Sequence, residues 1–322
     1  MYIVRALEKG DFDKLLHFTD RSSYGLLSLP KDHEKLIEKL NQSLSDFRKE
    51  VMEPKSEIYF FVLENTKTKE IGGCCAIYSK TAVKIPYYFF LVDQDLLHPF
   101  SLVDGPAELC ALYLAPEFRS QGLGTFLSIS RLMFIANFPS RFEKQIMARI
   151  RGVITKEGNS PLWNALGQHF FHLSFKEAEI ALEANPDFVG EHLPIHPIYT
   201  CFLDDEARSV IGKPHPNSEG SLKILEKQGF KLTDWIDTFD GGPVLETSVQ
   251  EIELVKKSTL ATVQEIKQVE DGIEAMVGNR DTAFRVCQDT IRIIDKTHVQ
   301  ISPETADALQ VTVGGTIRYA KL

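Results

Sequence analysis

The stretch from Glu108 to Thr125 carries the residues best suited to bind a phosphorylated carrier in this 322-residue chain. A strand-like apolar segment runs there into a basic, glycine-containing turn with Arg119, Gln121, Gly122 and Gly124. Apolar residues then recur at helical spacing as far as Phe138, which predicts that a helix begins in the turn. The first N–H groups of a helix are unpaired and its start is electropositive, so a phosphate or pyrophosphate can bind there.

The spacing alone fits an ordinary connection between a strand and a helix equally well. No GxxxxGK[ST] motif occurs, and the third glycine of GxGxxG is absent because Gly124 is followed by Thr125, Phe126 and Leu127. What remains is Arg-x-x-Gly-x-Gly after a strand. This pattern resembles the pyrophosphate loop of the GNAT acyltransferase superfamily.

The segment before the turn offers a second contact with an acyl carrier. Backbone groups from Cys110 to Leu114 can pair with the amides of a pantetheine arm as an added strand does, and an N–H there can polarise a thioester carbonyl. Attack of an amine on a thioester needs a neutral amine, a polarised carbonyl and a proton for the departing thiolate. Holding both reactants in place supplies much of the rate, on the order of 7 kcal/mol or more.

His215 is the candidate for proton transfer. It stands between Pro214 and Pro216, which restrict its backbone and can hold the imidazole in a fixed direction. An imidazole titrates near neutrality and can give a proton to a leaving sulfur, an effect typically of about 100- to 10,000-fold in rate. The alternative is a surface histidine in a stiffened loop, and the residues alone favour that alternative.

Other charged residues are candidates for binding an amino acid. Glu108 opens the strand, where its carboxylate either accepts the amine's proton or is a charge at the strand edge. Asp237 and Asp240 lie in an acidic run broken by glycines, which either binds a guanidinium through charge-assisted bonds or is a solvated loop. Arg149 and Arg151 bind either the substrate carboxylate or the succinyl carboxylate, or they pair with nearby acids.

Composition excludes several classes of function. The net charge of −9 argues against a general nucleic-acid partner, since Lys and Arg supply most non-specific affinity for phosphates. No secretory signal is visible, and no apolar run reaches the roughly 18 residues that a membrane span requires. We therefore expect a cytoplasmic protein that contacts no membrane.

No metal site is expected. His192 and His196 are four residues apart, but Pro194 would break the helix needed to bring both rings to one face. The five cysteines form no CxxC pair and are interpreted as reduced core thiols.

The patterns of residues 1–254 predict a mixed α/β domain with a half-open sheet. Strands are expected at 2–6, 59–64, 71–78, 108–114 and 147–154, and helices after Asp11 as N-cap, at 32–47 and from the turn to 138. Residues 83–105 are aromatic and apolar without a clean period, so Tyr87, Tyr88, Phe89, Phe90 and Phe100 are interpreted as core or, less favoured, as the lining of an acyl channel.

Two later segments share one shape. Residues 159–171 and 221–230 both read as a short helix stopped by a glycine and followed by an aromatic residue, and either can close a carrier cleft. Residues 255–322 are predicted to form a small β-barrel-like module, with β-prone runs at 283–294, 299–301 and 316–320 and a tight turn at Gly314 and Gly315.

Several longer strings resemble the arginine N-succinyltransferase family, and the resemblance covers nearly the whole chain. The strings are SSYGLLSLP (22–30), AELCALYL (107–114), RGVITKEGNSPLWNALGQHFF (151–171), HPIYTCFL (196–203), IGKPHP (211–216), LEKQGF (225–230) and DTFDGGPVLE (237–246).

The resemblance implies a GNAT-type fold and transfer of the succinyl group of succinyl-CoA to the α-amino group of L-arginine, the first step of an arginine-degrading route. By position, Leu112 falls where the family binds succinyl-CoA, and His215 falls on its proton donor, which makes catalysis the favoured role for that histidine. The CoA-binding residues expected are Leu112, Leu114, Arg119, Gln121, Gly122, Gly124 and Thr125.

The resemblance also implies that succinyl-CoA is a co-substrate, with no permanently bound cofactor, and that the amine attacks directly. Relatives suggest a homo-oligomer or pairing with a related subunit. Two alternatives stay open: a related N-acyltransferase that uses ornithine, another amino acid or acetyl-CoA, and a non-catalytic module that senses CoA or an amino acid.

Overall fold

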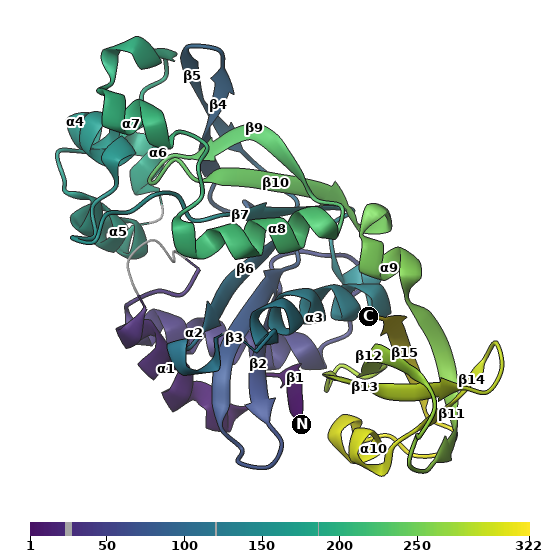
Figure 1. Ribbon diagram of the computed structural model, residues 1–322. Coiled ribbons are helices and arrows are strands. Elements are labelled where there is room, and N and C mark those ends of the chain that lie inside the picture. The colour runs from purple at the N-terminus through teal and green to yellow at the C-terminus, as the bar shows by residue number, and fades with distance from the viewer. Residues whose placement is uncertain (23–27, 120, 186) are drawn as a thin grey trace.

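The computed structural model describes residues 1–22, 28–119, 121–185 and 187–322 (Figure 1). Most of the string at 22–30 and one residue of the predicted phosphate-binding turn, Ser120, therefore lie outside the described residues. Within the described part, no helix is long and apolar enough to cross a membrane.

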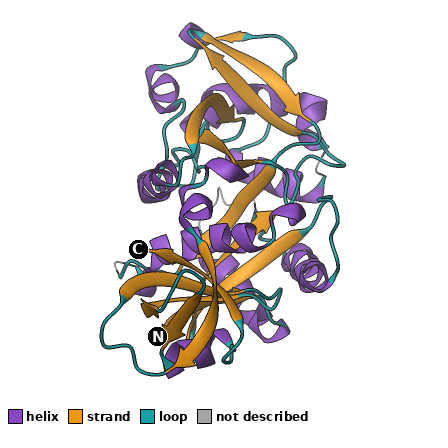
Figure 2. Cartoon of the chain, turned by 90° about the vertical axis from the view of Figure 1, so that its right-hand side faces the viewer, coloured by secondary structure: helices purple, strands orange, loops and turns teal. Residues whose placement is uncertain are grey.

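The larger part of the molecule is built on a mixed sheet with helices on both sides (Figures 1 and 2). Its strands are β1 (Tyr2–Ala6), β2 (Ile58–Asn65), β3 (Ile71–Tyr78), β4 (Tyr87–Asp93), β5 (Leu96–Leu102), β6 (Ala107–Leu114), β7 (Gln145–Arg149), β8 (Ile198–Tyr199), β9 (Lys231–Asp237) and β10 (Pro243–Ser248). They are ordered β1-β2-β3-β6-β7-β10-β9-β4-β5-β8. Every neighbouring pair in this series is antiparallel except β6 and β7, which are parallel.

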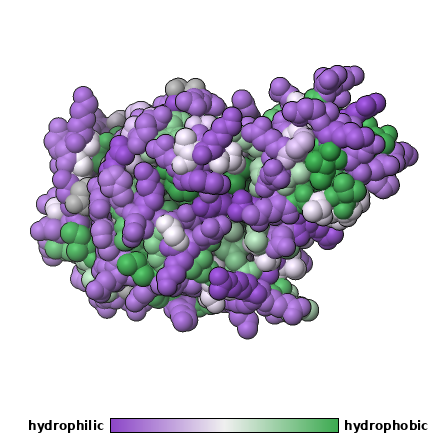
Figure 3. All heavy atoms as spheres, turned by 90° about the horizontal axis from the view of Figure 1, so that it is seen from below, coloured by the Kyte–Doolittle hydropathy of each residue, from purple (hydrophilic) through white to green (hydrophobic). Residues whose placement is uncertain are grey.

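Helices cover the sheet and build one end of the molecule. They are α1 (Phe12–Arg21), α2 (His33–Arg48), α3 (Leu123–Asn137), α4 (Gln168–Phe171), α5 (Phe175–Ala184), α6 (Phe188–His192), α7 (Asp205–Val210), α8 (Glu219–Lys227) and α9 (Glu253–Lys257). The helices α1, α2 and α3 and the strands β1, β2, β3 and β6 agree with the sequence predictions to within a few residues. The face seen from below is mostly hydrophilic, with scattered hydrophobic side chains (Figure 3).

The pairing of β6 with β7 is short. Partners are Ala107 with Ile146 and Glu108 with Met147, although β6 continues to Leu114 and β7 to Arg149. Beyond these residues β6 and β7 do not pair with each other, so the two strands separate after Glu108. This separation gives the half-open sheet that the sequence predicts, and it creates room for a ligand between the strands.

Helix α3 forms the centre of the core. Nearly all of its side chains are buried, and it contacts β2, β3 and β6 on one side and α8 and α9 on the other. A helix that is apolar all round is expected only in such a position. Asn137 at its last turn donates to the carbonyl of Asn279 and accepts from Arg318 at 2.9 Å, so α3 also joins the C-terminal part of the chain.

The C-terminal part forms a small closed barrel with one helix, α10 (Pro303–Leu309). Its strands are β11 (Thr259–Ile266), β12 (Ile273–Asn279), β13 (Arg285–Ile293), β14 (His298–Ile301) and β15 (Thr316–Lys321). They follow the order β12-β15-β11-β14-β13, and β12 also pairs with β13, which closes the ring. Strand β1 pairs with β13, so both parts share hydrogen bonds. The predicted division between residues 254 and 255 falls within α9 and stays a prediction.

Several local predictions were wrong. The strand expected at 147–154 is β7, which begins at Gln145 and ends at Arg149, because the chain then turns toward the loop before β10. Asp11 precedes α1, but its carboxylate accepts from Arg5 and from the Glu8 N–H and does not cap the helix.

Gly167 does not stop the helix in the first helix-glycine-aromatic segment. It lies in a π-helical turn packed against the Trp163 ring, and the helix ends at His172 with a φ of 56°. The second segment agrees with the prediction, since α8 is followed by Gly229 at a φ of +91°. Residues 83–105 contain the hairpin of β4 and β5, in which Phe89 and Phe90 are buried in the core as favoured, whereas Tyr87, Tyr88 and Phe100 are only partly buried.

Candidate active site

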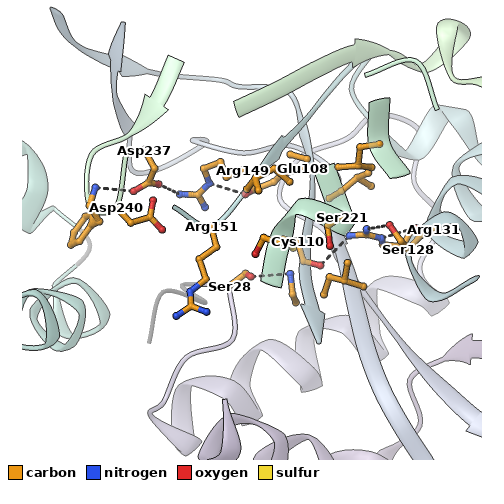
Figure 4. A pocket seen from close by; sticks show the side chains of 18 of the residues that line it. Ser28, Glu108, Cys110, Ser128, Arg131, Arg149, Arg151, Ser221, Asp237 and Asp240 are labelled. Carbon is orange, nitrogen blue, oxygen red and sulfur yellow. Dashed lines mark hydrogen bonds and ion pairs between the residues drawn. The ribbon is translucent and has the colours of Figure 1, made fainter. Parts of the chain in front are cut away.

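A pocket opens where β6 and β7 separate (Figure 4). Strand β6 contributes residues 108–112, and β7 with the loop after it contributes 148–151. Helices α3, α5 and α8, the end of β9 with the turn after it, Ser28 and Ser218 complete the lining. Of the two helix-glycine-aromatic segments, α8 therefore lines the pocket, and the segment 159–171 does not.

A row of alternating charges crosses the pocket. Arg149 Nε donates to Glu108 Oε1 at 2.8 Å, and Arg149 Nη1 donates to Asp237 Oδ2 at 3.4 Å (Figure 4). The guanidinium also lies over the Tyr87 ring, 4.7 Å from its centre. Burial acts to lower the pKa of Arg149, but Glu108, Tyr87 and Asp237 raise it well above its usual value. Arg149 is thus a fixed cation held by two acids. This agrees with the predicted role in which it pairs with nearby acids.

Two buried side-chain atoms have no hydrogen-bond partner within the described residues, and both belong to residues of this pocket. One is Glu108 Oε2, an acceptor, and the other is Arg151 Nε, a donor. Buried polar groups are nearly always paired, because an unpaired one costs about 1–3 kcal/mol. One unmet acceptor and one unmet donor in the same pocket match a ligand that carries both an amino group and a carboxylate.

Asp240 faces the same pocket from the turn after β9. Its carboxylate accepts from the Gly152 N–H at 2.7 Å and from the Gly242 N–H at 2.8 Å. Burial and the neighbouring Asp237 nevertheless raise the pKa of Asp240 to about 7, since a second negative charge is disfavoured there. A cation that enters the pocket would stabilise the ionised form.

Strand β6 carries a bulge beside the pocket. The register with β3 shifts between Cys74 and Ala76, and Ala111 has a φ of 52°. This left-handed conformation of a residue with a Cβ costs on the order of 1–3 kcal/mol, and such strain is often found at functional sites. The Ala111 N–H donates at 2.8 Å to the hydroxyl of Ser28, another residue of the pocket lining.

His215 lies next to the pocket and is not part of its lining. Its backbone N–H donates to the Arg151 carbonyl at 2.8 Å, and its ring Nδ1 accepts from the Asn217 N–H at 3.0 Å. A neutral ring that accepts at Nδ1 carries its proton on Nε2. Partial burial, and then the charge of Arg151, lower the pKa of His215 from 6.5, which favours the neutral ring.

The start of α3 lies outside the pocket, at the far end of β6. Gly122 is its N-cap with a φ of +74°, so the helix begins where the sequence predicts. Among the residues that the structure describes, no side chain caps this end, which leaves the first N–H groups available to an anion. Gln121 and Thr125 are exposed there, Gly124 belongs to the first helical turn, and Arg119 Nε donates to the Leu114 carbonyl at 3.2 Å.

Apart from His215, which lies next to the pocket, the structure divides the predicted site residues into two groups. The pocket brings together Glu108, Leu112, Arg149, Arg151, Asp237 and Asp240. A second group, at the helix start, contains Leu114, Arg119, Gln121, Gly122, Gly124 and Thr125, and strand β6 connects the two. Sequence reasoning missed Ser28, Ser221 and Arg131 of the lining. A single charged residue within the apolar run 123–136 was the signal that could have found Arg131.

Comparison with known proteins gives matches over the whole chain. The family described as arginine N-succinyltransferase beta subunit matches residues 2–254, and the C-terminal domain of that subunit matches residues 258–321. Arginine N-succinyltransferases from Citrobacter koseri and Salmonella schwarzengrund are 34% and 33% identical, over 100% of this chain and 98% of theirs. A solved structure, subunit AI of arginine/ornithine succinyltransferase from Pseudomonas aeruginosa, matches with a TM-score of 0.89 and 29% identity, over 100% of this chain and 98% of that one. The predicted architecture, a mixed α/β sheet followed by a β module, is confirmed.

Proposed function

The chain belongs to the arginine N-succinyltransferase family and is an acyltransferase, and from this premise we propose that it transfers the succinyl group of succinyl-CoA to the α-amino group of L-arginine. The products are N2-succinylarginine and CoA. The amine nitrogen forms the new amide bond as the carbon–sulfur bond breaks, and the proton lost by nitrogen is gained by sulfur.

The observation that carries the proposal is the pair of unmet groups in the pocket. Glu108 Oε2 is placed to accept from a cationic group of arginine, and Arg151 Nε is placed to donate to its carboxylate. Asp237 and Asp240 add negative charge at the same end of the pocket, which suits a guanidinium. An amino acid with a basic side chain therefore complements the charges of this lining.

Strand β6 is the proposed track of the carrier. A pyrophosphate bound at the start of α3, by residues 119–125, leaves the pantetheine arm to follow β6 past Leu114 and Leu112 toward the bulge. The N–H of Ala111 is the group that we assign to polarise the thioester carbonyl, whose oxygen would take the place of Ser28 Oγ, the acceptor of this N–H in the structure. This path ends in the pocket that binds the amino acid.

His215 is the proposed proton donor to the departing sulfur. It lies beside Arg151 at the edge of the pocket, with Nδ1 bound to the Asn217 N–H and the proton of the neutral ring therefore on Nε2. A neutral imidazole is a far weaker acid than a thiol, so the ring donates to sulfur as the imidazolium, after it has taken up the proton that the amine loses. The proline on each side fixes the backbone that carries it. Its contribution is expected to be about 100- to 10,000-fold in rate.

We also propose that the protein acts in the cytoplasm, where acyl-CoA is made, and assembles with copies of itself or with a related subunit. The apolar side chains of Tyr199, in the edge strand β8, and of Phe202, shortly after it, are 56% and 83% exposed and offer a surface for such a contact.

The test is direct. Purified protein is mixed with L-arginine and succinyl-CoA, and N2-succinylarginine is measured by mass spectrometry. Parallel rates with acetyl-CoA as donor and with ornithine as acceptor distinguish the proposal from the related acyltransferases. A strong preference for acetyl-CoA would contradict the assignment of the donor, and a preference for ornithine would contradict that of the acceptor.

A further inference from the structure

Arg131, on α3, places a third guanidinium in the pocket. The residue is 2% exposed and lines the cavity together with Ser128 and Ser221 (Figure 4). Its Nε donates to the Ser128 carbonyl at 3.0 Å, Nη2 donates to Ser128 Oγ at 3.1 Å, and Nη1 donates to the Cys110 carbonyl at 3.2 Å. All three partners are neutral.

No acid neutralises this charge. Among the residues that the structure describes, no carboxylate forms an ion pair or a hydrogen bond with Arg131, and the seven residues outside that part include no Asp or Glu. Burial lowers the pKa of Arg131, but a guanidinium stays charged in proteins. A buried and uncompensated charge is costly, so its presence in a cavity indicates an anionic ligand.

The other two pocket arginines differ in this respect. Arg149 is already paired with Glu108 and Asp237, and Arg151 lies near Asp240, which offsets its charge. An anion entering the pocket on the α3 side would therefore meet its strongest uncompensated attraction at Arg131. Asp237 and Asp240 lie at one end of the pocket and Arg131 at the other (Figure 4).

Arg131 also has the donors and the position for this role. A guanidinium has five N–H groups, and three are used, which leaves one on each terminal nitrogen for a carboxylate. Nη1 is bound to the carbonyl of Cys110, the residue before Ala111, whose N–H we assign to the thioester carbonyl. In a succinyl group, two methylene groups separate the thioester carbonyl from the carboxylate, so both ends can be bound next to this part of β6.

We propose that Arg131 binds the terminal carboxylate of the acyl group and makes the pocket selective for thioesters of dicarboxylic acids over those of acetate and other monocarboxylic acids. This inference rests on the proposed function, because it assumes that the acyl carrier follows β6. Ser128 and the Cys110 carbonyl hold the guanidinium in place. Selectivity arises because a donor without the carboxylate leaves a buried charge unpaired.

The competing role for Arg131 is a purely structural link between α3 and β6. Arg141 provides the matched control, since it is another buried arginine whose guanidinium donates to the carbonyls of Asp46 and Lys49, and it lies outside the pocket. If Arg131 contributed only through its burial and its hydrogen bonds to carbonyls, Arg131→Met and Arg141→Met would have similar effects on kcat/KM for the acyl donors.

The experiment measures kcat/KM with L-arginine for succinyl-CoA, butyryl-CoA and acetyl-CoA. We expect Arg131→Met to lower the value for succinyl-CoA by at least about 100-fold, as for the loss of a buried charge-assisted contact, and to leave the value for butyryl-CoA unchanged or higher. Arg131→Lys keeps the charge and should retain part of the preference for succinyl-CoA. Arg141→Met should leave the ratio of the two donors unchanged.

Binding separates this inference from the proposed function. Titration calorimetry without arginine compares succinyl-CoA with CoA, and Arg131→Met should weaken only the former. A wild-type protein that binds succinyl-CoA but does not succinylate arginine would overturn the proposed function and leave this inference standing. Equal losses for all donors, or an unchanged preference in Arg131→Met, would overturn the inference alone. If Arg131→Met does not fold, Ser128→Ala takes its place, with a smaller loss of preference expected and an unchanged preference counting against the inference.

Discussion

Arg149 and Glu108 form an ion pair at the point where the two parallel strands separate. Arg149 Nε lies 2.8 Å from Glu108 Oε1, and the second carboxylate oxygen is left buried without a partner in the described residues. The pair fixes the carboxylate in one orientation, so that a single oxygen is presented to the pocket. Glu108 is placed on one strand and Arg149 on the next, which means that the separation of the strands itself builds the site.

Replacement of Glu108 by Gln should weaken the binding of arginine. The change keeps the shape of the side chain and removes the charge that Oε2 presents. Because hydrogen bonds between charged groups contribute about 1.5–3 kcal/mol, we expect KM for arginine to rise by about 10- to 100-fold. Steady-state rates at saturating succinyl-CoA measure this.

Glu64 serves as the matched control for Glu108. It is also a buried carboxylate paired with an arginine, since Arg5 Nε donates to its Oε2 at 2.6 Å, and it lies outside the pocket. Glu64→Gln should affect stability and leave KM unchanged. If both variants raised KM alike, the loss would reflect the fold, and Glu108 would have no role in binding arginine.

Arginine binding should release a proton from Asp240. The pKa of this carboxyl is raised to about 7 by burial and by Asp237, so it is largely protonated in the free protein just below that pH. A bound guanidinium favours the ionised form and expels the proton. Calorimetric titration of arginine at pH 6.5, in two buffers with different ionisation enthalpies, measures the release.

A variant tests the cause of the Asp240 shift. Asp237→Asn removes the neighbouring charge and should move the pH of maximal proton release downward. The raised pKa of Asp240 also affects the stability of the wild-type protein. Between pH 3.8 and about 7, the folded state holds a proton that the unfolded state releases. The free energy of unfolding therefore decreases as the pH rises through that range. Binding without any proton release in either protein would rule out an ionisation change at Asp240.

His215 should titrate below its ordinary value. Burial and Arg151 both lower its pKa from 6.5, so the ring is neutral at neutral pH. An NMR titration of the free protein measures the midpoint, and Arg151→Met should move it upward because a positive charge is removed. A midpoint at or above 6.5 in the wild-type protein would contradict the geometry described here.

The two roles of His215 can be separated by a pair of variants. Its Nδ1 accepts from the Asn217 N–H, and an Asn side chain can make the same contact, because Asn is a favoured residue at such positions. His215→Asn therefore keeps the turn and loses the Nε2 proton, and His215→Ala loses both. We expect kcat to fall by about 100-fold or more in both variants if His215 transfers a proton. Full activity in His215→Asn would reduce the residue to a structural role.

The parts of the site that depend on local sequence patterns could be predicted from the sequence. The strand, the turn and the start of α3 were predictable because apolar periodicity and the glycine at 122 are local signals. Glu108 and Arg149 were recognised as candidates, but their pairing was not, since it depends on strands that are 41 residues apart in sequence.

The parts that sequence reasoning missed depend on packing between distant segments. Arg131 lies in an apolar helix, and only the fold shows that it faces β6 and not solvent. The bulge at Ala111 has no glycine to signal its left-handed backbone. The closure of the C-terminal barrel requires β12, which was not predicted. This strand pairs with β13, which follows it directly, and with β15 at the end of the chain.

The proposed pyrophosphate site at the start of α3 can be tested with a substitution that should stabilise the helix and weaken CoA binding. Gly124 lies in the first turn, and a Cβ there would meet only Leu114 at 3.6 Å, an ordinary contact, so Gly124→Ala should fold normally. Gly124→Asp adds a negative charge near the helix N-terminus, which stabilises the helix by about 0.3–1 kcal/mol but repels a pyrophosphate. We expect an unchanged or higher free energy of unfolding for Gly124→Asp, together with a CoA affinity at least about tenfold weaker than that of Gly124→Ala. Denaturant unfolding and calorimetric titration of CoA measure the two quantities. Equal CoA affinities for the two variants would place the pyrophosphate elsewhere and remove β6 as the track of the carrier.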